Sequence, residues 1–126
     1  MSQDVISDAL NMIRNAHKAK KKEVKIDRIS RLLIEILKIM KAKGVIKGYK
    51  INSKEKSVEV TIGELNECQA IKPRFTADKE QVEKYMRRYL PARGIGTMIV
   101  STNKGLMTHE EALDIGIGGC LIAYFW

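Results

Sequence analysis

The sequence predicts an α+β fold, with an N-terminal α/β lobe followed by a mostly β C-terminal lobe that carries a short helix. Three observations lead to this prediction. Two apolar stripes with the helical period come first, strand-like alternation follows them, and the last part of the chain alternates apolar runs with turn residues. Because the composition shifts to a short polar connection around residues 63–69, we expect two lobes, 1–66 and 67–126.

Two helices are expected in the N-terminal lobe. Apolar residues between 5 and 16 recur every three or four positions, as on one face of an amphipathic helix. A more regular stripe covers residues 29–40, and Gly44 is suited to a left-handed position just after this helix. Between the helices, adjacent lysines at 20–22 form a basic corner before a short strand at 24–26.

The remaining elements are expected to be mainly strands. In the N-terminal lobe, strands at 45–51 and 58–62 are joined by a polar turn. Thr108 with Glu111 three residues later forms a capping-box pattern, which predicts a short helix from Thr108 that ends by Gly116. The C-terminal lobe should contain, in order, a strand at 70–76, a charged helix or turn at 79–90 ended by Pro91, a strand at 97–100, a polar loop at 101–107, the short helix and a last strand at 120–126.

The composition predicts an anionic partner. The chain has 126 residues, of which 44% are hydrophobic, so it can bury a core. Its formal net charge of +8 favours nucleic acid as the partner. No apolar run reaches the roughly 20 residues of a membrane-spanning helix, and the start lacks a signal-peptide pattern. We therefore expect a cytoplasmic protein with no membrane partner.

The cysteines and histidines do not predict a metal site. Cys68 and Cys120 lack the paired spacing of zinc-binding motifs, and His17 and His109 lie far apart without neighbouring ligands. We expect free thiols, no metal and no cofactor.

The segment from Ser101 to Gly105 is the leading candidate for a binding site. Ser101, Thr102, Asn103, Lys104 and Gly105 combine two hydroxyls, an amide, a cation and a flexible glycine. These groups suit the minor groove of RNA, where 2′-hydroxyls and base edges donate and accept hydrogen bonds. An ordinary polar turn accounts for the same residues, so both interpretations stay open.

Basic residues outside this segment could contact phosphates. A solvated charged surface is the alternative interpretation for such runs. The candidates are Arg14, Lys18 and Lys20, Lys21 and Lys22 near the end of the first helix, and Lys72 and Arg74 at the lobe boundary.

A catalytic interpretation is weaker. Ser101 as nucleophile and His109 as base, oriented by Glu110 or Glu111, would make a small hydrolase, but no nucleophile-elbow motif is present and Glu111 already has a capping role. We expect no enzyme activity and no small-molecule substrate. The aromatic residues near the C-terminus and in 79–90 are interpreted as core.

Several motifs together resemble one family, ribosomal protein eight of the small subunit. The resemblance runs over essentially the whole chain and keeps the order of the motifs. Ile71-Lys72-Pro73-Arg74-Phe75 looks like the archaeal and eukaryotic branch. The motifs are Ile13-Arg14-Asn15-Ala16, Arg93-Gly94-Ile95-Gly96, Ser101 to Gly105, Thr108-His109-Glu110-Glu111-Ala112 and Gly118-Gly119-Cys120-Leu121-Ile122-Ala123-Tyr124-Phe125-Trp126.

The resemblance implies a ribosomal role. Members bind the central domain of small-subunit ribosomal RNA early in assembly, beside neighbouring ribosomal proteins, so the chain is expected in the ribosome. Ser101 to Gly105 would make the main RNA contact through a minor groove, and Arg14 and Asn15 a secondary one. Some members also repress translation of their own messenger RNA, which is an alternative function.

Two positions depart from the family pattern. Asn103 stands where a serine is common, and Cys120 stands where bacterial members carry a glutamate. Asparagine still donates and accepts hydrogen bonds, but cysteine does not replace a carboxylate acceptor. The contact that the glutamate makes in bacterial members is therefore not transferred to Cys120.

Overall fold

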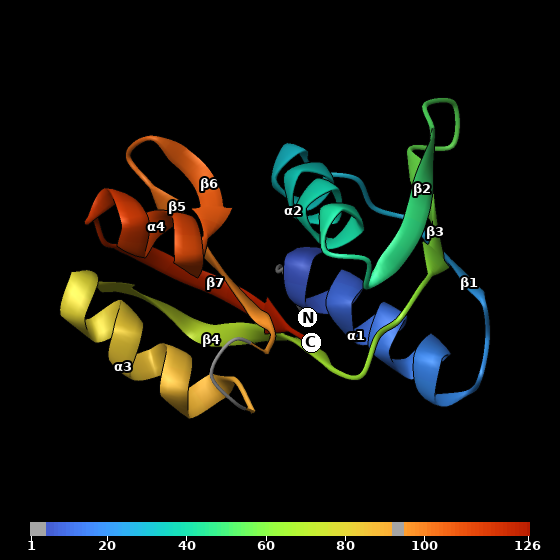
Figure 1. Cartoon of the computed structure of the whole chain (residues 1–126). Helices are drawn as coiled ribbons and strands as arrows, with labels where there is room; N and C mark the ends of the chain where they lie inside the picture. Colours follow the sequence, from blue (N-terminus) through green and yellow to red (C-terminus); the bar gives the residue numbers. More distant parts are fainter. Residues whose placement is uncertain (1–4, 92–94) are drawn as a thin grey trace. The chain divides into compact units, whose positions relative to one another are not determined.

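The computed structural model describes residues 5–91 and 95–126, with backbone alone for 72–75 (Figure 1). Within these residues, four helices and two β-sheets confirm the predicted α+β fold class. The chain divides into two compact units, an N-terminal unit of residues 1–69 and a C-terminal unit of residues 70–126. The division falls inside a strand, β4 (Cys68–Ala77), so no separate linker joins the units.

The N-terminal unit packs two helices with a three-stranded antiparallel sheet. In the sheet, β3 lies between β1 and β2. The elements are α1 (Val5–Lys18), β1 (Glu23–Ile26), α2 (Arg31–Ala42), β2 (Ile46–Asn52) and β3 (Ser57–Ile62).

The core of this unit follows the helical stripes that the sequence predicts. In α2, Leu33, Ile36, Leu37 and Met40 are all fully buried, and each such side chain contributes about 1.5–3 kcal/mol of burial. Ser30 caps α2 by accepting a hydrogen bond from the Leu33 amide at 3.1 Å.

The C-terminal unit is built on a four-stranded sheet in the order β4-β7-β5-β6. Met98, Val100 and Leu121 are fully buried within its core. Besides β4, the elements are α3 (Lys79–Tyr89), β5 (Thr97–Thr102), β6 (Gly105–Thr108), α4 (His109–Ile115) and β7 (Gly119–Phe125).

The predicted polar loop at 101–107 is wrong, because most of this segment is strand. β5 continues through Thr102, and β6 pairs with it from Gly105 onward, which leaves a tip of two residues. Backbone pairing in a hairpin does not require apolar side chains, so alternation did not mark β6.

Two other predictions are refined. The charged segment at 79–90 is a helix, begun by a capping box between Asp78 and Gln81. The expected strand at 70–76 extends over the ten residues of β4, an edge strand, where Pro73 removes an amide donor without breaking a central ladder.

The aromatic residues interpreted as core are not all buried. Phe125 is buried, whereas the other four are half-buried and stack in a row across α3 and β7. The ring centroids are 6.1 Å apart for Tyr85–Tyr89, 5.1 Å for Tyr89–Tyr124 and 5.8 Å for Tyr124–Trp126. Such stacking covers the sheet face beneath it while leaving part of each ring in solvent.

Candidate nucleic-acid interface

The candidate site lies at the end of a rigid hairpin, β5–β6. β5 pairs with β6 on one side and with β7 on the other, so Ser101 lies opposite both Leu106 and Cys120. A residue in a central strand has its backbone fixed from both sides. The backbone of Ser101 is therefore held in place before any ligand binds.

The Thr102 hydroxyl closes the tip. It donates a hydrogen bond to the Gly105 carbonyl at 2.9 Å and accepts one from the Lys104 amide at 3.1 Å. Gly105 has a φ of +112°, a backbone conformation that is strained for any residue with a side chain. Nothing lies within 4 Å of the position that a Cβ on Gly105 would take. Thr102 therefore shapes the turn, while Asn103 and Lys104 stand exposed at its end.

The Ser101 hydroxyl is available to a ligand. Within the described part of the chain this hydroxyl makes no hydrogen bond. Ser101 is half-buried, and its hydroxyl oxygen is accessible to solvent. Gly119 lies directly behind Ser101, and a Cβ on Gly119 would overlap the Ser101 carbonyl oxygen. This close approach requires glycine in β7.

The same glycine-rich turn also supports the other side of the unit. Gly116 ends α4 in the left-handed conformation, at φ +85°. A Cβ on Gly118 would overlap the carbonyl oxygen of Ala77, the last residue of β4. The glycines thus fit a helix-to-strand turn between closely packed backbones.

Ser101 and His109 are not arranged for nucleophilic catalysis. The His109 ring is buried, and its Nδ1 accepts a hydrogen bond from the Met98 amide at 3.0 Å. Met98 precedes Ser101 by three positions in β5, roughly 10 Å along the strand. The Nδ1 atom is therefore occupied by a backbone amide of β5, at a position of the strand that is distant from Ser101.

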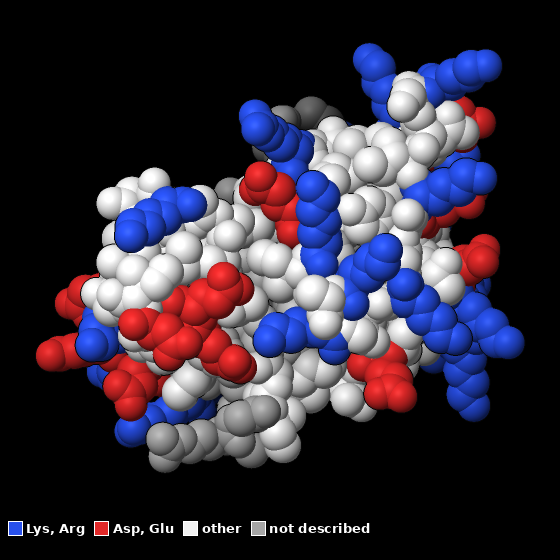
Figure 2. Space-filling model, turned by 45° about the horizontal axis from the view of Figure 1, so that its top comes forward, with Lys and Arg blue, Asp and Glu red and all other residues white. Residues whose placement is uncertain are grey.

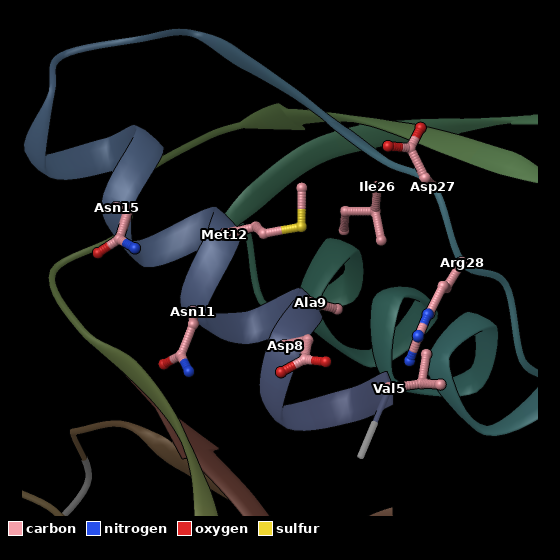
Figure 3. A pocket seen from close by; sticks show the side chains of 9 residues that line it. All are labelled: Val5, Asp8, Ala9, Asn11, Met12, Asn15, Ile26, Asp27 and Arg28. Carbon is pink, nitrogen blue, oxygen red and sulfur yellow. The ribbon is translucent and has the colours of Figure 1, made fainter. Parts of the chain in front are cut away.

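The predicted secondary residues lie on α1 in the N-terminal unit. The Arg14 Nε atom is buried and lies 2.5 Å from Glu67 Oε1, so this side of the guanidinium group forms an ion pair. Glu67 also accepts from the Cys68 amide at 3.2 Å. Asn15 is exposed at the edge of a groove of about 480 Å³ between α1 and the segment after β1 (Figure 3).

This groove contains residues that the sequence did not single out. Asn11 lies one helical turn before Asn15, and both amides project from α1 along the groove (Figure 3). Arg28 lines the opposite side. The four-residue spacing of the two asparagines was a signal that could have found Asn11.

Cations are unevenly divided between the units. Residues 1–69 contain 15 lysines and arginines against 9 aspartates and glutamates, whereas residues 70–126 contain 8 against 6. In Figure 2, lysine and arginine side chains stand out over much of the surface that the N-terminal unit contributes. Lys18 is exposed at the end of α1. The side chains of Lys72 and Arg74, in β4, lie outside the described residues.

Two features are absent from the residues that the structure describes. Histidine, cysteine, aspartate and glutamate side chains form no group of three that could hold a metal ion. No helix in this part of the chain has the length and apolar character to span a membrane.

A small α+β chain with an excess of cations and an exposed polar hairpin tip is typical of basic nucleic-acid-binding proteins. The sequence profile of the family described as Ribosomal protein S8 matches residues 4–126. The chain is 40% identical over 129 residues to "Small ribosomal subunit protein uS8" of Nanoarchaeum equitans, and 39% identical to the protein of that name from Archaeoglobus fulgidus. Both alignments cover the whole of each chain.

The chain therefore belongs to the ribosomal protein S8 family, and the resemblance found in the sequence is confirmed. Both of these relatives are archaeal, in agreement with the branch indicated by residues 71–75. A structural role in the small ribosomal subunit, RNA binding and a place in translation follow from the family.

Proposed function

We propose that this protein binds the central domain of small-subunit ribosomal RNA, supports assembly of the subunit and recognises RNA through its β5–β6 hairpin. The observation that carries the proposal is the Ser101 hydroxyl, which is solvent-accessible and unpaired within the described residues, on a strand fixed from both sides. A hydroxyl on a backbone fixed in this way can bind a 2′-hydroxyl without the cost of ordering the backbone.

Each residue of the hairpin tip has a distinct role in this proposal. Ser101 and Asn103 exchange hydrogen bonds with 2′-hydroxyls and base edges in the minor groove. Lys104 contacts a phosphate. Gly105 leaves open space in which the RNA backbone can approach, and Thr102 acts as a positioning residue because its hydroxyl is used within the turn.

Secondary contacts come from residues outside the hairpin. Asn15 presents its amide at the groove edge, and Arg14, paired on one side with Glu67, offers the rest of its guanidinium group. Lys18, Lys72 and Arg74 add phosphate contacts that do not depend on sequence. Neighbouring small-subunit ribosomal proteins are the other expected partners.

The test compares binding to a central-domain ribosomal RNA fragment and to a DNA duplex of matched sequence over a salt series. We expect the parent protein to prefer RNA, and Ser101→Ala to weaken RNA binding about two- to tenfold, because one hydrogen bond contributes roughly 0.5–1.5 kcal/mol. DNA binding should not change with this substitution, since deoxyribose lacks the 2′-hydroxyl.

Lys104→Ala and Lys54→Ala form a matched pair. Both lysines are exposed in hairpin turns, and both changes remove one charge. Only Lys104→Ala should lower the salt dependence of RNA binding by the amount expected for the loss of one phosphate contact. Equal affinity of the parent for RNA and DNA, or equal effects of the two lysine changes, would refute recognition through the β5–β6 hairpin.

A further inference from the structure

The two helices of the N-terminal unit end in the same hydrogen-bonded turn. At the end of α2, the Gly44 amide donates to the Lys41 carbonyl at 3.1 Å and the Val45 amide to the Met40 carbonyl at 3.2 Å. At the end of α1, the Lys20 amide donates to the His17 carbonyl at 3.0 Å and the Lys21 amide to the Ala16 carbonyl at 2.9 Å. Both are Schellman motifs, which place one residue in the left-handed conformation.

The residue at that left-handed position differs between the helices. α2 has Gly44 there, with φ +81°, whereas α1 has Lys20, with φ +61°. A side chain in this conformation brings its Cβ close to the following carbonyl oxygen, and glycine avoids the conflict. Lys20 therefore makes the end of α1 less stable than a glycine would, and the fold itself gives no reason for the lysine.

The charges around Lys20 add a second unfavourable effect. Lys18, Lys20, Lys21 and Lys22, which we call the lysine corner, are all exposed. None of them forms an ion pair with an acidic residue in the described parts of the chain. Four like charges within five residues repel one another, and none of the four is in an ion pair that would offset this repulsion directly.

The lysine corner is nevertheless held in a fixed shape. The Schellman turn fixes it on the α1 side, and on the other side the Ile62 amide donates to the Lys22 carbonyl at 2.8 Å, which ties the corner to β3. A fixed backbone that carries four lysines without ion pairs in the described parts of the chain can present their ammonium groups together to an anion with several charged oxygens, and it differs in this from a flexible basic tail.

From these observations we infer that the lysine corner is a phosphate-backbone binding site of the N-terminal unit, in which Lys20 keeps a strained backbone so that its ammonium group reaches the RNA. The inference rests on the proposed function, because it takes the anion to be structured RNA. It assigns to this corner a large share of the salt-dependent affinity, in agreement with the excess of cations in residues 1–69.

Lys20→Gly tests the inference because its two expected effects have opposite signs. Relief of the left-handed strain should raise the melting temperature by roughly 3–6 °C. Loss of one phosphate contact should lower the slope of log K against log salt by roughly 0.7–0.9 and weaken RNA binding about fivefold at ~0.1 M salt.

Lys56→Gly is the matched control. Lys56 is also an exposed lysine with positive φ, +51°, but it lies in the turn before β3, next to Glu55. This change should raise the melting temperature to a similar extent and leave the RNA salt slope unchanged. A general effect of removing one charge would instead lower the slope in both variants and overturn the inference.

The failure of the inference and that of the proposed function give different results. If Lys20→Gly keeps the parent's slope while Ser101→Ala removes the preference for RNA over DNA, the lysine corner is not a binding site and the hairpin proposal stands. If Lys20→Gly lowers the slope equally on RNA and DNA while the parent shows no preference between them, the corner binds phosphates and the hairpin proposal fails. A lower melting temperature for Lys20→Gly would refute the strain on which the inference is based.

Discussion

Cys68 shows how burial changes the chemistry of a single residue. Its thiol is buried and donates to the Leu10 carbonyl, with sulfur and oxygen 3.4 Å apart. Burial raises the pKa of the Cys68 thiol to about 12, the Glu67 carboxylate raises it further and the Arg14 guanidinium opposes the shift. The folded protein therefore keeps this thiol protonated, and hence poorly reactive, under conditions in which a free cysteine ionises.

This shift predicts a loss of stability at high pH. Because the pKa is raised from 9.0 in the unfolded chain to about 12 in the fold, the contribution is fully present below pH ~9 and is lost as the pH rises toward ~12. Between pH ~8 and ~10.5, the parent should lose up to about 2 kcal/mol more unfolding free energy than Cys68→Ala. Urea titrations at the two pH values measure the difference. Cys120→Ser, which changes the half-buried thiol, should retain the parent's pH dependence; an identical dependence in Cys68→Ala would contradict the assignment.

At the scale of an element, the backbone conformation of Gly105 constrains the β5–β6 hairpin. Gly105→Ala should lower the unfolding free energy by roughly 1–3 kcal/mol, since a side chain at φ +112° is strained even in open space. Gly48→Ala in β2 is the control, because that position is equally open and its φ is not positive. Chemical denaturation should find Gly48→Ala neutral or slightly stabilising. Equal destabilisation by both changes would show that the φ of Gly105 is not the cause.

The elements also show what the sequence can predict and why. Gly44 takes its predicted left-handed position, and Thr108 caps α4 by accepting from the Glu111 amide at 3.2 Å, because caps depend on residues close in sequence. β6 was missed because its four residues gain their structure from pairing with β5, which leaves no periodic pattern.

The candidate site likewise has features that the local sequence predicts and features that depend on tertiary contacts. Residue types and the family resemblance were sufficient to select the segment from Ser101 to Gly105. They did not reveal that the Thr102 hydroxyl is used within the turn, or that Arg14 is paired with Glu67, a residue distant in sequence. Such contacts depend on tertiary structure and leave no trace in local composition.

At the scale of the whole molecule, the proposed lysine corner and the proposed recognition hairpin belong to different units. The N-terminal unit has an excess of six cations and includes the lysine corner, whereas the C-terminal unit has an excess of two and includes the hairpin. Phosphate contacts supply affinity without sequence information, and hydrogen bonds to sugars and base edges supply selectivity. Affinity and selectivity should therefore respond to different substitutions.

This division predicts additive effects of Ser101→Ala and Lys20→Gly on the free energy of RNA binding. The two residues belong to different units and share no hydrogen-bonding or strand-pairing partner among the residues described, and independent sites usually add within about 0.3–0.5 kcal/mol. The RNA affinity of the double variant should thus fall by the product of the two single fold-changes. The double variant should also show the RNA-over-DNA preference of Ser101→Ala and the salt slope of Lys20→Gly. Binding titrations of the four proteins at one salt concentration complete the cycle. A double variant no weaker than the weaker single variant would mean that one change already abolishes the bound state in which the other residue acts, and that the two units do not contribute independently.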